Sequence, residues 1–246
     1  MSTIGGRTIT FEEFADFLAI YTANPKPIFF WDTCGLLEII RFVYRKNNGL
    51  NTLNSILDLA GRLSRDEIYC VTSELAAVEW DDNMVTALND MRNSLVKTEN
   101  YHVLAASTIN AILPGTTIQS DPISAYRLED LLKDIALDIA QSSHFIKYEE
   151  VATDTLTRVA LKMPPGKEKD AEIKDCAFWE TMLRLCKDIK AAMPGGSPSK
   201  VFYTVNTKDF ADKSTGTPVL FHQLQSEAAS MGFTGTLLID DAVASL

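Results

Sequence analysis

The stretch PIFFWDTCGLLEII, residues 27–40, indicates the fold most directly. Its apolar run, Ile28 to Trp31, stops abruptly at Asp32. A strand without alternating polar positions is typical of a strand buried on both faces, as in a parallel sheet. The residues from Leu36 to Tyr44 then have the apolar spacing of an amphipathic helix. The stretch therefore predicts a strand, a turn and a helix, which is the repeating unit of an α/β fold.

Three further strands are expected from short apolar runs, at Ile68 to Val71, Val201 to Val205 and residues 235–240. Helical patterns separate them, and strands that alternate with helices favour a doubly wound parallel sheet. We expect an α/β protein with a Rossmann-like sandwich around a central parallel sheet. Residues 200–210, KVFYTVNTKDF, repeat the pattern of the opening stretch, because strand-forming residues again run into polar ones.

The remaining segments have helical patterns. Thr10 and Glu13 have the form of a capping box, so the first 25 residues are expected to add a helix. Residues 84–150 contain no run that predicts a strand. The expected organisation is a single domain over residues 1–246 with a helical insertion at roughly 91–157.

The composition is that of a protein with a substantial core. Of the 246 residues, 46% are hydrophobic, and no apolar run approaches the roughly 18 residues of a membrane span. The first residues lack the pattern of a secretion signal. The four cysteines have no C-x-x-C spacing, so we expect reduced thiols in a soluble, cytoplasmic protein. The net charge of −10 argues against bulk electrostatic attraction to nucleic acid.

Four acidic residues stand where an α/β sheet would hold a ligand, beyond the carboxyl ends of the strands. Asp32 follows the first strand, Glu79 lies on the helix after the second, Asp209 follows VFYTV, and Asp175 begins the preceding helix. Gathered carboxylates repel one another unless a cation neutralises them, and their oxygens are preferred ligands of Mg²⁺ and Mn²⁺. Two such ions can activate water and stabilise the leaving oxygen of a phosphodiester.

Each acid also has a purely structural interpretation. An Asp after a strand is often a helix N-cap, and Asp209 can form an Asx turn. The three histidines are scattered along the chain, and neither Ser73 nor Cys34 has a histidine nearby in the sequence. Covalent catalysis is therefore poorly supported. Hydrolysis by metal-activated water needs no histidine.

Four motifs in order resemble those of the PIN-like domain nucleases, in the larger bacterial branch with a helical insertion: FFWDTCGLLEI, VTSELAAVEWDDN, IKDCAFWETMLRL and YTVNTKDF. The resemblance covers roughly residues 28–90 and 158–240. It implies a Rossmann-like sandwich and Mg²⁺- or Mn²⁺-dependent endonuclease activity, usually on RNA. The acids that it implies as catalytic metal ligands are Asp32, Glu79, Asp175 and Asp209.

The resemblance also assigns supporting positions. Those beside the acids are Thr33, Thr204 and Asn206. Glu79 is preferred to Glu74 as the second acid because the family places its acid near the E-W end of this helix turn. A basic connection of the form R…PP-x-K also precedes the IKDC helix in this branch. The side chains expected to hold substrate phosphate, with a solvated charged loop as an equal alternative, are Arg158, Lys167, Lys169 and Lys208.

Charge along the chain agrees with a phosphate contact in that region. Residues 158–213 hold 11 Lys and Arg against 8 Asp and Glu, whereas the rest of the chain holds 12 against 25. The choice between RNA and DNA depends on contacts to the 2′-hydroxyl, which no motif reveals. RNA is the expected substrate from the resemblance alone.

Other functions stay open on the sequence. A PIN-like module without catalysis could bind nucleic acid or a protein partner. The FFWDT motif is similar to the start of a haloacid-dehalogenase-like phosphatase, but such enzymes need a second Asp where this chain has Cys34. PIN toxins paired with an antitoxin are usually much shorter than this chain. Neither an antitoxin nor a homo-oligomer has support in the sequence.

Overall fold

The computed structural model describes residues 2–45, 48–113, 115–119, 121–166, 173–214 and 216–246. The strands are β1 Ser2–Ile4, β2 Arg7–Ile9, β3 Phe11–Glu12, β4 Ile28–Trp31, β5 Tyr69–Ser73, β6 His144–Ile146, β7 Lys200–Tyr203, β8 Ala211–Asp212, β9 Val219–Leu220 and β10 Thr234–Thr236. The helices are α1 Phe14–Ala23, α2 Thr33–Ile40, α3 Leu50–Ser64, α4 Leu75–Ile112, α5 Leu128–Gln141, α6 Ala152–Ala160, α7 Ile173–Ala192, α8 Thr207–Phe210, α9 His222–Met231 and α10 Ile239–Ala244. Short 3-10 helices are η1 Phe42–Tyr44, η2 Ile123–Tyr126 and η3 Glu149–Val151.

The central sheet has six strands in the order β10-β7-β4-β5-β6-β3, and each neighbouring pair is parallel. Phe29 of β4 is in register with Cys70 of β5 on one side and Val201 of β7 on the other. The predicted parallel sheet of an α/β protein is confirmed. Two antiparallel pairs, β1 with β2 and β8 with β9, lie outside it.

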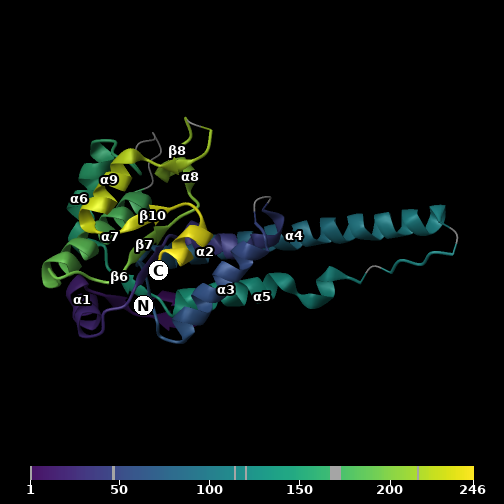
Figure 1. The fold of residues 1–246 in the computed structure, drawn as a ribbon, viewed down its shortest axis with the longest axis horizontal. Coiled ribbons are helices and arrows are strands. Elements are labelled where there is room, and N and C mark those ends of the chain that lie inside the picture. The colour runs from purple at the N-terminus through teal and green to yellow at the C-terminus, as the bar shows by residue number, and fades with distance from the viewer. Residues whose placement is uncertain (1, 46–47, 114, 120, 167–172, 215) are drawn as a thin grey trace.

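Hydrophobic residues fill both faces of the sheet, as expected for apolar strands without polar alternation. In β4, Phe29 and Trp31 pack on one face, against α2, α3, α5 and α10 and the start of α4. Ile28 and Phe30 pack on the other face, against α1, α7 and α9. Helices therefore cover the sheet on both sides (Figure 1). This is the layered arrangement of a Rossmann-like sandwich.

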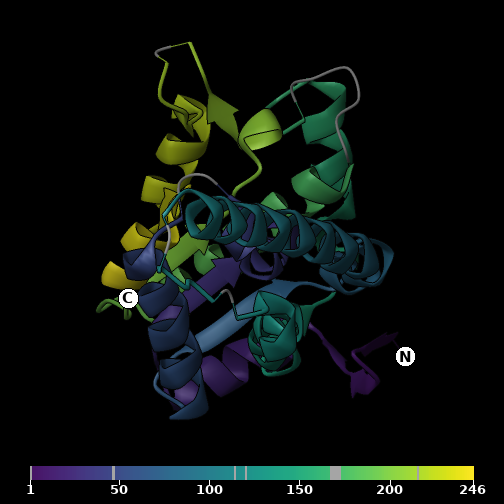
Figure 2. The ribbon, with the colours of Figure 1, turned by 90° about the vertical axis from the view of Figure 1, so that its right-hand side faces the viewer.

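Helix α4 extends far beyond these layers (Figure 1). Its first half packs in the core through residues such as Trp80 and Met91, and its second half projects from the body together with the chain that returns to α5. In Figure 2 this projection points toward the viewer. Among the described residues of the second half, Tyr101, Leu104 and Ile112 are exposed. We call the described residues of the range 96–127 the arm.

The N-terminal prediction is only partly right. Phe14, Phe17 and Tyr21 do form the buried face of a helix, α1. The residues before it form β1, β2 and β3 and not a helix. Glu13 precedes α1 without capping it through its side chain, because its carboxylate binds the ammonium of Lys147 at 2.5 Å.

Two other predictions of secondary structure need correction. The prediction of no strand within residues 84–150 is wrong, since His144–Ile146 forms β6 and pairs with β5 in the central sheet. The stretch predicted as a helical insertion, 91–157, thus contributes a strand to the sheet. The strand expected at residues 235–240 is shorter than predicted, and the chain enters α10 at Ile239.

Membrane segments and disulfides are absent from the described part of the chain. None of its helices combines the length and the apolar character that crossing a membrane requires. The four cysteines are free, and three of them are buried: Cys70, Cys176 and Cys186. This agrees with the expectation of reduced thiols.

Candidate functional site

A small cavity lies at the carboxyl ends of β4 and β5, against the first turn of α7. Three of the four predicted acids line it: Asp32, Glu79 and Asp175. The other residues in its wall are Thr33, Ser73, Leu75, Ala76, Lys174 and Phe178. We call this the acidic cavity. It forms because the first turns of α2, α4 and α7 meet at one edge of the sheet.

Asp32 joins β4 to α2 and is buried. One carboxylate oxygen, Oδ1, accepts a hydrogen bond of 2.7 Å from the backbone N–H of Gly35, which makes Asp32 the N-cap of α2. The other oxygen, Oδ2, accepts a hydrogen bond from the hydroxyl of Thr204, just past the end of β7. The structural interpretation of Asp32 as a helix cap is thus correct, and it does not conflict with a place in the cavity.

Burial raises the pKa of the Asp32 carboxyl from 3.8 to about 7. Loss of hydration is the largest cause, and the nearby charge of Glu79 adds to it. The hydrogen bonds from Thr204 and Gly35 act in the opposite direction because they stabilise the carboxylate. Asp32 therefore exchanges its proton near neutral pH.

Glu79 lies on the second turn of α4 and faces the cavity. Its carboxylate is 3.5 Å from the ammonium of Lys174. Glu74, the alternative second acid, points elsewhere, since its carboxylate accepts a hydrogen bond of 3.0 Å from the backbone N–H of Tyr148. The structure therefore places Glu79, and not Glu74, beside Asp32.

Asp175 and Asp209 are linked through the side chain of Asn206. The amide nitrogen of Asn206 donates to Asp175 Oδ2 at 3.2 Å, and its amide oxygen accepts from the backbone N–H of Asp209 at 3.3 Å. Asp209 itself is buried at the end of α8 and does not line the acidic cavity. Three of the four acids that were expected to face one another therefore line one cavity, and Asp209 does not.

The two threonines predicted to support the site behave differently. Thr204 orients Asp32 through its hydroxyl, which also accepts a hydrogen bond of 2.9 Å from the backbone N–H of Asn206. Thr33 is buried in the cavity wall, and its hydroxyl oxygen has no hydrogen-bond partner among the described residues. A buried polar atom without a partner is rare, because it loses its hydration without compensation. The Thr33 hydroxyl is thus available to a ligand in the cavity.

The charge of the acidic cavity affects the thiol of Cys34. Burial raises the pKa of its thiol far above the usual range, and the three carboxylates of Asp32, Asp175 and Glu79 raise it further. The thiol stays protonated at neutral pH and is a poor nucleophile. This agrees with the sequence-based argument against covalent catalysis.

The donor chemistry of the cavity suits a hard divalent cation. Three carboxylates and an unpartnered threonine hydroxyl supply oxygen ligands of the kind that Mg²⁺ and Mn²⁺ prefer. These oxygen atoms do not, however, form a preformed metal-binding site. Within the described part of the chain, no three His, Cys, Asp or Glu side chains are gathered closely enough to hold a metal ion. Metal binding would require these side chains to move closer together and the contact between Lys174 and Glu79 to weaken.

The expected substrate-binding cations have different positions. Lys208 is exposed on α8. Lys167 and Lys169 lie outside the described residues. Arg158 is buried, and its guanidinium binds the carboxylates of Glu180 at 2.5 Å and Glu227 at 2.9 Å.

A third guanidinium nitrogen of Arg158 donates to the backbone oxygen of Pro164. All three nitrogens are thus engaged inside the protein. The prediction of a phosphate contact at Arg158 finds no support in this geometry.

Sequence reasoning missed one charged residue of the cavity, Lys174. It stands directly before Asp175 in the IKDC motif, and its ammonium lies 3.5 Å from the carboxylate of Glu79. Its position next to Asp175, a predicted site residue, was the one sign in the sequence that Lys174 could belong to the site. The sequence could not show that this side chain lines the cavity and pairs with Glu79.

Comparison of the sequence with protein-family models and with curated proteins finds no match, and neither does comparison of the structure with solved structures.

Proposed function

We propose that this protein is a Mg²⁺- or Mn²⁺-dependent endonuclease of the PIN-like type that hydrolyses phosphodiester bonds, with RNA as the expected substrate. One observation carries the proposal. Three acids that are distant in sequence, Asp32, Glu79 and Asp175, line one cavity at the carboxyl edge of a parallel sheet. Ligands of such sheets bind at this edge, and concentrated carboxylates are unfavourable unless a cation compensates them.

The residues of the cavity have complementary capabilities. Asp32, Glu79 and Asp175 supply carboxylate oxygens that would hold a divalent cation. The ammonium of Lys174 and the free hydroxyl of Thr33 can donate hydrogen bonds to phosphate oxygens. A bound divalent cation would supply positive charge to the phosphodiester and lower the pKa of a bound water. Lys208, exposed nearby on α8, suits a contact with the nucleic-acid backbone.

The first prediction concerns cleavage of labelled single-stranded RNA in the presence of Mn²⁺. We expect cleavage by the wild type, and a rate about 100-fold or more lower for Asp32→Asn and for Glu79→Gln, because each removes a carboxylate from the cavity. Glu74→Gln is the matched control, since Glu74 lies one turn earlier on the same segment and bonds to Tyr148 outside the cavity. Absence of cleavage by the wild type on RNA and on DNA, or equal loss in all three variants, would contradict the proposal.

The second candidate function is a nucleic-acid-binding module without catalysis. The ion pair between Lys174 and Glu79 favours it, because the lysine already compensates one carboxylate without a metal. Calorimetry with Mn²⁺ separates the two functions. Saturable binding of Mn²⁺ that is lost in Asp32→Asn supports the nuclease, whereas RNA binding that needs no Mn²⁺, without cleavage, supports the module.

A further inference from the structure

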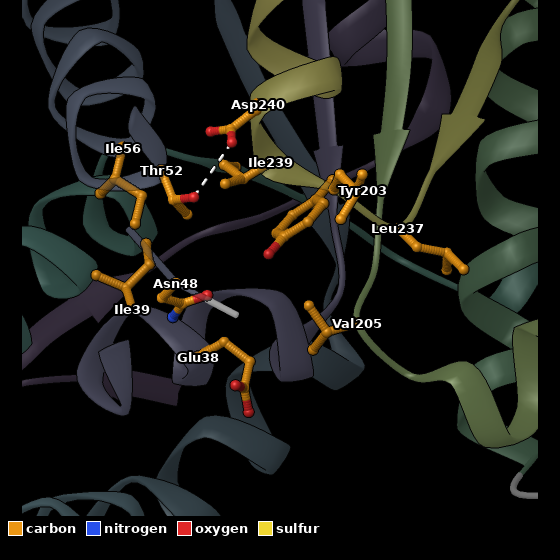
Figure 3. A pocket seen from close by; sticks show the side chains of 11 residues that line it. Glu38, Ile39, Asn48, Thr52, Ile56, Tyr203, Val205, Leu237, Ile239 and Asp240 are labelled. Atoms are coloured by element: carbon orange, nitrogen blue, oxygen red, sulfur yellow. Dashed lines mark hydrogen bonds between the residues drawn. The ribbon is translucent and has the colours of Figure 1, made fainter. Parts of the chain in front are cut away.

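A second cavity, separate from the acidic one, opens between α2, α3, α10 and the end of β7 (Figure 3). Its volume is about 320 Å³. The walls combine aliphatic side chains, such as Ile39, Ile56 and Val205, with several polar ones. None of the proposed nuclease residues lines it.

Asp240 supplies an unsatisfied acceptor to this cavity. Its Oδ2 atom accepts a hydrogen bond of 3.1 Å from the hydroxyl of Thr52, as the dashed line in Figure 3 shows. Its Oδ1 atom is buried and has no hydrogen-bond partner among the described residues. A buried carboxylate oxygen without a donor is costly, so a ligand that brings an N–H group would stabilise it.

Tyr203 supplies a second polar atom. The side chain is 94% buried, since the residue is 6% exposed, and its ring stacks on Phe29 with centroids 6.0 Å apart. Its hydroxyl makes no hydrogen bond with any residue of the described chain, and Figure 3 shows it turned into the cavity. Burial and the charges of Asp32, Glu38 and Asp240 raise the pKa of this phenol, so it stays protonated.

The charge of the cavity excludes anions. Of its two carboxylates, Glu38 is compensated from outside the cavity, by Arg45 at 2.5 Å and Arg41 at 3.5 Å. Asp240 has no ion pair among the described residues. No Lys, Arg or His belongs to the described lining. An occupant therefore has to be neutral or cationic, and it has to carry hydrogen-bond donors.

We propose that this cavity binds a ligand through a guanidine group, in the form of a guanine base or a free alkylguanidine. Both present adjacent N–H donors and no negative charge at the binding edge, which matches the open acceptor of Asp240 and the hydroxyl of Tyr203. The apolar remainder of either ligand would pack on Ile39, Ile56 and Val205. A volume of about 320 Å³ accommodates one such group.

The position of Tyr203 connects the two cavities. A Cβ atom at Gly35 would lie 2.9 Å from the Tyr203 ring and 3.2 Å from Asp32 Oδ1, so the tyrosine ring packs close behind the acidic cavity. A guanine bound here would be a base neighbouring the cleaved phosphate, and this part of the inference rests on the proposed nuclease function. Binding of the guanidine group itself does not depend on that function.

The test is calorimetric titration of the full chain with guanosine and with agmatine, in EDTA and without RNA. We expect saturable binding of at least one probe, and the probe that binds identifies the source of the guanidine group. Asp240→Asn should weaken binding about tenfold or more, and Tyr203→Phe should weaken it less, because an uncharged partner is lost. Asp241→Asn, an exposed carboxylate one residue along α10, should bind like the wild type.

Two outcomes would overturn the inference. One is the absence of saturable binding of either probe. The other is an equal affinity of Asp240→Asn and Asp241→Asn, provided that thermal melting shows both variants folded. Since no metal and no RNA are present, either result is independent of whether the protein cleaves RNA.

Discussion

Asp32 uses its two carboxylate oxygens for different purposes. Oδ1 caps α2 through Gly35, and Oδ2 is fixed by Thr204. Together they hold a buried carboxyl in one orientation beside Glu79 and Asp175. Fixing a side chain by several hydrogen bonds is how binding sites obtain precise geometry.

The pH dependence of stability tests the environment of Asp32. Its carboxyl pKa is 3.8 in the unfolded chain and about 7 in the folded one, so the folded state holds the proton more tightly. This carboxyl therefore favours folding below about pH 4, and that contribution is lost as the pH rises to about 7. Without metal, the free energy of unfolding of Asp32→Asn relative to the wild type should rise by roughly 2 to 4 kcal/mol between pH 4 and 7.5. Urea denaturation in EDTA measures it, and a constant difference across this range would contradict the prediction.

A substitution at Gly35 tests how closely α2 and β7 approach each other. An added Cβ atom would meet the Tyr203 ring at 2.9 Å and Asp32 Oδ1 at 3.2 Å. We expect Gly35→Ala to lower the free energy of unfolding by about 1 to 3 kcal/mol, because the core cannot accept the extra methyl group without shifting. Gly49→Ala is the control, since a Cβ atom there meets nothing within 4 Å. Urea denaturation compares the two variants, and equal stabilities would show that Tyr203 is free to move.

At the scale of elements, α6, α7 and α9 are joined through one buried guanidinium. Arg158 of α6 binds Glu180 of α7 and Glu227 of α9, and Glu227 also accepts a hydrogen bond of 2.7 Å from the indole of Trp179. Burial raises the pKa of the Glu180 carboxyl, and the charge of Arg158 opposes that increase. The arginine thus compensates two carboxylates that are largely removed from water.

Replacing Arg158 with Met should lower the free energy of unfolding by about 3 to 5 kcal/mol, because two buried carboxylates lose their cation. Adding Glu180→Gln and Glu227→Gln to the same chain should recover part of the loss. Arg184→Met removes partly exposed ion pairs with Asp188 and Glu150 and should cost less than about 1 kcal/mol. Urea denaturation at pH 7 compares the variants. A small effect at Arg158 together with RNA binding defects would instead favour the phosphate contact expected from the sequence.

Prediction of elements succeeded where the sequence pattern was local. The apolar runs of β4, β5 and β7 and the helical patterns of α1 and α2 indicate their own structure. It failed at β6, where His144 to Ile146 is short and adjoins a helix, so only pairing with β5 and β3 makes it a strand. It also failed at Glu13, because the competing partner Lys147 is 134 residues away in the sequence.

At the scale of the whole molecule, α4 lies partly in the core and partly in solvent. Its 38 residues make a helix about 57 Å long, and only its first half is packed in the core. In the arm, Tyr101 is 72% exposed and Ile112 is 68% exposed. Among residues 96–112, Ala106 is the only buried one.

Hydrogen exchange should therefore differ along α4. We expect amides of residues 98–112 to exchange much faster than those of residues 79–95, because opening of the arm exposes little buried surface. Exchange measured by mass spectrometry on peptides from the two halves tests this. Equal protection along the helix would mean that another molecule covers the arm in solution.

The sequence by itself determined the class of the fold. Wholly apolar strands that alternate with helices can be buried on both faces only in a layered parallel sheet, and the acids that follow them must then lie at one edge. Local pattern also placed Asp32 directly after its strand and Asp175 near the start of its helix, where the structure has it in the first turn of α7.

Only the tertiary structure decided which of these side chains meet. It places Glu79 and Lys174 in the wall of the acidic cavity, whereas Glu74 bonds elsewhere. The backbone of Asp209 bonds to Asn206, and the guanidinium of Arg158 is paired inside the protein. The cavity beside Tyr203 has no counterpart in any motif, because its wall comes from segments up to about 200 residues apart. Burial and partners depend on the packing of distant elements, and a local pattern carries no information about that packing.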